Sequence, residues 1–173
     1  EIKGIIRLLK VMLEKENGNW DKVKEQNDED KAGAGFTGRK IKAYDKLELT
    51  DEQQKVLATL RQNCVEETLW SAIAAFQNYP FRTSSGLPYQ YKLKIGKDGT
   101  YNKELLIDRR ENSKTLSWSS IKMAFQNCRQ ISGIVKRPKA LGDIRGISYI
   151  YPLFWKFGLI EVPEEIAKKM GVE

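Results

Sequence analysis

The chain has 173 residues, of which 40% are hydrophobic, a formal net charge of +7 at pH 7 and no histidine. Its length suffices for one good core, and it contains no run of about 18 apolar residues that could span a membrane. Without histidine there is no Ser-His-Asp triad, Cys-His pair or histidine zinc motif. Any enzyme would need carboxylates, lysines and a hard metal such as magnesium.

Residues 1–49 predict an N-terminal helix followed by a charged linker. Apolar residues recur at helical spacing from Ile2 to Leu13, and Gly18 ends the pattern. From Glu14 to Lys46 charges of both signs crowd together, which is typical of a solvated and partly mobile linker. The opening residues lack the order of a signal peptide, so we expect a cytoplasmic protein.

Residues 33–38 match Gly-x-Gly-x-x-Gly letter for letter. A dinucleotide site needs this motif between a strand and a helix, so that the phosphate meets the helix N-terminus. Here a charged run precedes the motif and no helical stripe follows it. We interpret it as a hinge and expect no cofactor.

Residues 50–173 predict the main domain, which begins with helices and a hairpin. Thr50-Asp51-Glu52-Gln53 forms a capping box that opens a helix through about Asn78. Residues 89–95 alternate between apolar and polar side chains and predict a strand. A Gly-Lys-Asp-Gly turn joins it to a second strand, residues 104–108.

The second half of this domain predicts two further helices, a short strand and a short helix. Ser117 or Thr115 can cap a helix that buries Ile121, Ala124, Phe125 and Cys128 and ends at Gly133. Ser148 is expected to cap the next helix, with Pro152 in its first turn and Gly158 at its end. Residues 159–162 predict a strand, and residues 163–169 a short helix.

Five large rings crowd the helix that follows Ser148, and they are most simply core residues. Five rings are not expected to face inward on one helix, so one or two would reach a dimer or partner surface. The five rings are Tyr149, Tyr151, Phe154, Trp155 and Phe157.

Together these elements predict an α+β fold with about five helices around a small antiparallel sheet. The strand at residues 159–162 also allows a winged-helix-like C-terminal part. The two cysteines, Cys64 and Cys128, lie at apolar positions of helical segments. We interpret them as buried free thiols, with a disulfide as the alternative.

The positive charge is concentrated in one stretch. From Arg82 to Arg145 there are 14 Lys and Arg against 5 Asp and Glu, a net of +9, whereas Glu1 to Pro80 has 13 against 14. The same stretch carries aromatic residues that can stack on bases: Tyr89, Tyr91, Tyr101 and Trp118. This combination predicts binding to nucleic-acid backbones or to an acidic protein surface.

The candidate binding residues fall into three groups: the hairpin face, the start of the third helix, and the segment before the fourth. They are Lys92, Lys94, Arg109 and Arg110; Lys114 and Lys122; and Lys136, Arg137, Lys139 and Arg145. A merely solvated surface, balanced by the acids of the first half, is the alternative.

Two carboxylates raise a nuclease as a further alternative. Glu104 and Asp108 are four apart in a predicted strand, hence on one face, and Lys92 or Lys94 could approach them across the hairpin. The spacing differs from the Asp…Glu-x-Lys of the common nuclease core. Cross-strand ion pairing is the simpler explanation of these residues.

The stretches at residues 81–91, 104–109 and 146–151 resemble a family of small proteins from gut Firmicutes and their mobile elements, a family that includes inhibitors of the type II-A CRISPR nuclease Cas9. The resemblance covers roughly Thr50 to Val162. Many such inhibitors are acidic mimics of DNA, whereas this chain is basic. The resemblance therefore implies that it grips Cas9 while touching nucleic acid, or blocks a conformational step.

The first hypothesis is thus a non-enzymatic anti-CRISPR protein of a phage or mobile element. Its expected protein partner is Cas9 or another acidic or nucleoprotein partner, and it is also expected to bind a DNA or RNA backbone. The alternative is a DNA-binding regulator or maintenance protein of such an element. A magnesium-dependent nuclease comes third. Whether the chain forms a homodimer is left open.

Overall fold

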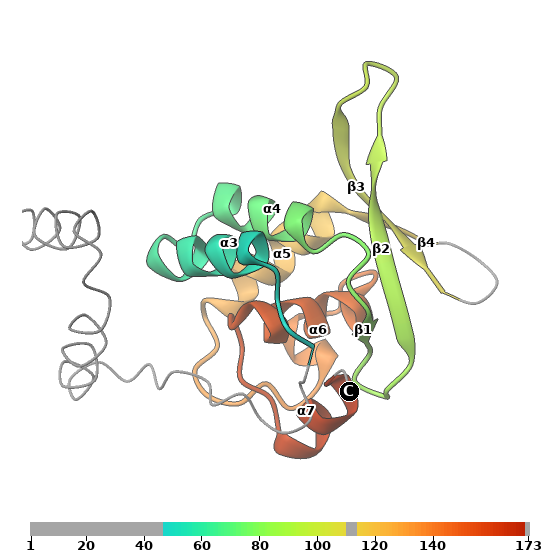
Figure 1. Ribbon diagram of the computed structural model, residues 1–173. Coiled ribbons are helices and arrows are strands. Elements are labelled where there is room, and N and C mark those ends of the chain that lie inside the picture. Colours follow the sequence, from blue (N-terminus) through green and yellow to red (C-terminus); the bar gives the residue numbers. More distant parts are fainter. Residues whose placement is uncertain (1–46, 110–113, 172–173) are drawn as a thin grey trace, which may run out of the picture. The chain divides into compact units, whose positions relative to one another are not determined.

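The computed structural model describes residues 47–109 and 114–171, and these form an α+β fold (Figure 1). Within this part of the chain there are five α-helices, four strands in one antiparallel sheet and a short 3-10 helix. None of the described helices is long and apolar enough to cross a membrane. In chain order the elements are α3 (Asp51–Gln62), α4 (Glu66–Ala75), β1 (Phe81–Arg82), β2 (Pro88–Ile95), β3 (Tyr101–Asp108), β4 (Lys114–Ser117), α5 (Trp118–Cys128), η2 (Pro138–Leu141), α6 (Ile147–Phe157) and α7 (Glu164–Met170).

The predicted α+β class is confirmed, and so is the first cap. Thr50 Oγ1 accepts from Gln53 N at 3.2 Å, and Gln53 Oε1 accepts from Thr50 N at 3.0 Å. The single helix expected through Asn78 is wrong, because α3 ends at Gln62 and α4 begins at Glu66. The Thr68 hydroxyl donates to the Asn63 carbonyl at 2.6 Å and so stabilises this break. The predicted N-terminal helix, most of the linker and the glycine motif lie outside the described residues.

The hairpin is confirmed, with two strands added to it. β2 and β3 pair antiparallel, with Tyr91 opposite Ile107 and Leu93 opposite Leu105. The two-residue β1 pairs with the start of β2, and β4 pairs with β3, which gives the strand order β1-β2-β3-β4. These short strands have no alternation of their own, so the sequence pattern did not reveal them.

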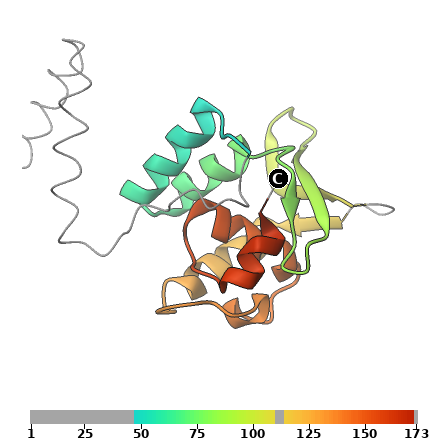
Figure 2. The ribbon, with the colours of Figure 1, turned by 60° about the horizontal axis from the view of Figure 1, so that its bottom comes forward.

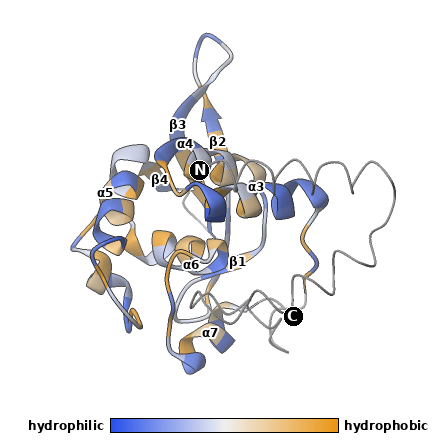
Figure 3. Cartoon of the chain, turned by 90° about the vertical axis from the view of Figure 1, so that its left-hand side faces the viewer, coloured by the Kyte–Doolittle hydropathy of each residue, from blue (hydrophilic) through white to orange (hydrophobic). Residues whose placement is uncertain are grey.

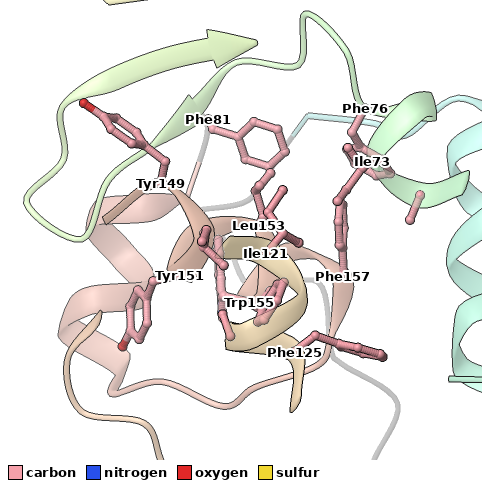
Figure 4. Packing of buried hydrophobic residues seen from close by; sticks show 14 of the residues in the cluster. Ile73, Phe76, Phe81, Ile121, Phe125, Tyr149, Tyr151, Leu153, Trp155 and Phe157 are labelled. Atoms are coloured by element: carbon pink, nitrogen blue, oxygen red, sulfur yellow. The ribbon is translucent and has the colours of Figure 1, made fainter. Parts of the chain in front are cut away.

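Helices cover one face of the sheet, as two views show (Figures 1 and 2). The strand residues that face them are buried: Tyr89, Tyr91, Leu93, Leu105, Ile107 and Leu116. Aromatic side chains also join the helices to one another, for example Phe76, the C-cap of α4, and Phe157 of α6, whose ring centroids are 5.1 Å apart (Figure 4). In contrast, α3 carries both hydrophilic and hydrophobic positions along its length (Figure 3). This is the pattern of a helix at the surface.

The two later helices differ in how well the sequence predicted them. In α5, Ser117 is the N-cap and accepts from Ser120 N at 3.4 Å, and the expected apolar face is buried. The helix ends at Cys128 rather than near Gly133. In α6, Gly146 rather than Ser148 is the N-cap. Pro152 therefore lies in the second turn and not in the first.

The expectation that one or two rings of α6 reach the surface is wrong. Ten of its eleven residues are buried, including all five large rings. The helix can be buried on every side because the polar group of a buried ring is hydrogen-bonded: Tyr151 Oη donates to the Val135 carbonyl at 2.6 Å. A helix that is apolar all round is the central helix of a core.

The C-terminal part contains less strand than expected. The predicted strand at residues 159–162 is reduced to a single parallel bridge between Ile134 and Glu161. The short helix is confirmed as α7, which has Glu164 and Glu165 in its first turn. The winged-helix-like arrangement is not confirmed by this geometry.

Candidate nucleic-acid interface

The outer face of the sheet carries two cations and two carboxylates, and one of the cations is paired. Lys92 and Lys94 are exposed because they alternate with buried residues along β2. Lys94 Nζ lies 3.0 Å from Glu104 Oε2, and Asp108 shares this face, opposite Gln90. Two lysines beside two carboxylates create little long-range attraction for a phosphate backbone.

Lys122 has a local partner as well. Its Nζ lies 3.2 Å from Glu66 Oε2, which joins α5 to α4. Both side chains remain more than a third exposed, so this pair orients the two helices rather than adding much stability. Arg110 lies outside the described residues.

A different group of cations gathers where β3 ends and β4 begins. Arg109 directly follows β3, and its guanidinium donates a hydrogen bond to Tyr149 Oη of α6. The same guanidinium lies 5.8 Å from the centre of the Tyr149 ring. Lys114 opens β4 as the register partner of Ile107, two residues before Arg109. The two cations are therefore neighbours across the strand pair.

The third member of this group comes from the segment that leads into α6. Arg145 precedes Gly146, whose backbone lies so close to β4 that an added Cβ would be 2.6 Å from Leu116 Cδ1. Gly146 also adopts φ +80°, which a side chain rarely tolerates. Arg145 therefore belongs to a segment that packs against β4; we name the three exposed cations Arg109, Lys114 and Arg145 the basic cluster. Within residues 47–109 and 114–171, none of the three has an ion-pair partner.

The connection between α5 and α6 supplies more exposed cations. Lys136, Arg137 and Lys139 follow Val135, whose backbone N donates to the Glu161 carbonyl at 2.8 Å. Lys139 has only a loose partner, Asp143 at 3.6 Å, and both of these side chains are highly exposed. The backbone is therefore held in place while the charges point into solvent.

Two of the four aromatic residues expected to stack on bases are inaccessible. Tyr89 and Tyr91 are 4% and 0% exposed. Tyr89 Oη donates to the Tyr149 carbonyl at 2.8 Å, and Tyr91 Oη to the Ile73 carbonyl at 2.6 Å. Burial raises the pKa of both phenols well above the usual value. The prediction that these two rings belong to a binding surface is wrong. The alternation showed which side chains share a face of the strand, but not that helices cover this face.

Among the cation–π contacts that sequence reasoning missed, that of Lys103 lies on the hairpin. Lys103 of β3 has φ 56° and lies where the β2–β3 register shifts. Its Nζ is 5.6 Å from the ring centre of Trp70 and 5.7 Å from that of Trp118. The two indoles meet edge to face at 5.2 Å. No local pattern announces this cluster, because its members come from α4, β3 and α5.

The carboxylates of the nuclease alternative make cross-strand contacts within the hairpin. Glu104 pairs with Lys94, and Asp108 Oδ2 accepts from Gln90 Nε2 at 3.5 Å. Among the described residues no group of three or more acidic, cysteine or histidine side chains could hold a metal. Both cysteines are free thiols, and burial raises the pKa of Cys128 to about 11. A raised pKa keeps this thiol protonated and unreactive at neutral pH.

No protein-family model, curated protein or solved structure matches the chain. The fold and the surface alone describe the protein: it is an α+β protein whose antiparallel sheet is covered by helices on one face and carries an exposed basic cluster at one end.

Proposed function

We propose that this protein binds nucleic acid without catalysing a reaction on it, and that its biological role is to inhibit Cas9. The basic cluster carries the proposal. Arg109, Lys114 and Arg145 come from three separate segments, are exposed, and are positioned by contacts of the folded core. Cations that are held in place, and that have no ion-pair partner among residues 47–109 and 114–171, favour an anionic ligand from outside the chain.

A nucleic-acid backbone suits this cluster better than a single small anion does. The cluster is continued along the chain by the exposed cations Lys136, Arg137 and Lys139. Each lysine or arginine that meets a phosphate releases condensed counterions, so binding gains entropy and depends steeply on salt. Such contacts read the backbone and not the sequence.

The Cas9 part of the proposal rests on the resemblance of residues 81–91, 104–109 and 146–151 to a family that includes Cas9 inhibitors. Cas9 holds guide RNA and target DNA, so a basic protein can bind nucleic acid that the nuclease has already engaged. A DNA-binding regulator of a mobile element would use the same cluster. It would bind free DNA and leave Cas9 cleavage unchanged.

Binding of a mixed-sequence 30-base-pair duplex at several salt concentrations tests the first part. Lys114→Glu/Arg145→Glu should weaken binding at all sequences alike and lower the slope of log K against log salt by about 0.9 for each phosphate that the variant no longer neutralises. The control is Lys55→Glu/Lys169→Glu, which changes net charge equally on α3 and α7. Equal weakening in both variants, or none in the first, would show that the cluster is not the contact surface.

A cleavage assay tests the second part. Purified protein should suppress Cas9 cleavage at near-stoichiometric amounts, and a pull-down with and without guide RNA should show whether the complex needs the RNA. Cleavage left untouched at about tenfold excess would favour the regulator. Magnesium-dependent cleavage by the protein itself, abolished in Glu104→Gln, would favour the nuclease.

A further inference from the structure

The free end of the β2–β3 hairpin exposes apolar side chains that the fold does not cover. Ile95 and Tyr101 are register partners and are 63% and 49% exposed. One step nearer the body, the pair Leu93 and Leu105 is 5% and 0% exposed. The hairpin extends past the helices, so its apolar residues continue where there is no core to bury them (Figure 1).

This end of the hairpin is ordered by its own contacts. At the tip, Gly96 N donates to the Thr100 carbonyl at 2.7 Å, and Thr100 Oγ1 donates to Asp98 Oδ2 at 2.8 Å. At its base, Lys103 is held against the indoles of Trp70 and Trp118. The exposed pair is thus presented on a preorganised arm, which lowers the entropic cost of binding.

The charge of the arm indicates what it meets. Residues 94–104 contain Lys94, Lys97 and Lys103 against Asp98 and Glu104, a net charge of +1, and Lys94 pairs with Glu104 at 3.0 Å. The Lys97 side chain is exposed, and within the described residues it has no ion-pair partner. A cationic, two-stranded ribbon with apolar side chains complements a groove of duplex DNA, whose walls are phosphates and whose floor is base edges.

We propose that the arm, residues 94–103, enters a groove of duplex DNA and places Ile95 and Tyr101 against the bases while Lys97 contacts a phosphate. This rests on the proposed nucleic-acid binding and adds a second contact, at the end of the hairpin remote from the basic cluster. About eight residues of strand separate the two contacts, roughly 26 Å. A duplex that reaches both covers about eight base pairs, at about 3.4 Å per pair.

The test uses the full chain and the same 30-base-pair duplex. Ile95→Ser/Tyr101→Ser should weaken binding at least about fivefold with an unchanged salt slope, because base contacts release no counterions. Lys97→Ala should instead lower the slope by about 0.9. Met123→Ser is the matched control, since Met123 of α5 is 53% exposed. It should bind as the wild-type chain does.

A direct readout accompanies the affinities. A benzophenone amino acid in place of Tyr101 should crosslink to the duplex on irradiation, and the same group in place of Met123 should not. If the wild-type chain binds but the double variant binds equally well and position 101 gives no crosslink, the arm proposal is overturned and the basic cluster stands. If the wild-type chain does not bind duplex at low salt, both proposals fall.

Analytical ultracentrifugation and a Cas9 pull-down distinguish the two other possible partners of the arm, a second copy of this chain and the Cas9 protein. If the double variant converts a dimer to a monomer, the arm is an interface between two copies of this chain. If DNA affinity is unchanged while a Cas9 complex no longer forms, the arm contacts protein. Either result overturns the DNA-groove proposal.

Discussion

The two ends of one hairpin have similar residues and opposite environments. Near the body, β2 and β3 turn Tyr91, Leu93 and Leu105 into the core, where they are at most 5% exposed. At the free end, Ile95 and Tyr101 pair across the same two strands but remain about half or more exposed. The β2–β3 register shifts between the two ends, but both pairs keep the same alternation along their strands. Their environments differ because helices cover only the end near the body (Figure 1).

This difference separates stability from binding. An apolar pair buried under helices contributes to folding in proportion to the area removed from water. An apolar pair left in water contributes little to folding, so its replacement leaves the fold intact and reports on contacts with a partner. Substitutions at the two ends therefore compare how much each apolar pair contributes to the free energy of unfolding.

The largest effect is expected from shortening a side chain at the buried end. Leu105→Ala should lower the free energy of unfolding by about 2–5 kcal/mol, because Leu105 is fully buried and leaves a cavity. Ile95→Ala, at the exposed end, should change it by less than about 0.5 kcal/mol. Urea denaturation measures both, and similar decreases would mean that the arm packs against the body in solution.

Two glycines with left-handed backbones offer a second comparison. Gly146 and Gly99 both have φ +80°, but an added Cβ meets Leu116 Cδ1 at 2.6 Å in the first and nothing within 4 Å in the second. Gly99→Ala, in the hairpin turn, should cost about 1–2 kcal/mol for the backbone alone. Gly146→Ala should cost about 1–3 kcal/mol more, because it also overpacks the contact with β4. Equal melting temperatures would show that Leu116 moves aside freely.

The buried tyrosines predict a decrease of stability in alkali. Burial raises the pKa of Tyr91 well above that of an unfolded tyrosine. The contribution of the protonated phenol is therefore fully present below about pH 10, the usual tyrosine pKa, and falls as the pH rises above it, since only the unfolded chain releases the proton. The free energy of unfolding, measured from about pH 8 to about pH 11, should fall less steeply in Tyr91→Phe. Parallel curves would contradict this assignment.

The smallest effect is expected at the ion pair on the outer face. A double-mutant cycle with Lys94→Ala and Glu104→Ala should give a coupling of about 0.2–1 kcal/mol, because both side chains are about a third or more exposed. Salt at about 1 M should remove most of it. A coupling that survives in high salt would mean that the pair is shielded from solvent.

Local patterns predicted the caps, whose hydrogen bonds lie within a few residues, and the hairpin, whose strands are joined by a recognisable turn. The Thr50 capping box, the Ser117 cap and the pairing of residues 89–95 with 104–108 are confirmed. The break between α3 and α4 escaped prediction because apolar spacing continues through it from Leu60 to Cys64. The candidate cations stay a prediction. What the structure adds is which of them carry local partners, such as Lys94 and Lys122.

The sequence by itself determined the fold class, the hairpin and the stretch that carries the positive charge, because periodicity, caps and charge counts are properties of neighbouring residues. Only the tertiary structure decided that Tyr89 and Tyr91 are core while Tyr101 is exposed, and that α6 is buried on every side. The physical reason is that burial depends on which distant elements pack over a face. Arg109, Lys114 and Arg145 form one cluster for the same reason, since α6 and β4 meet at Gly146.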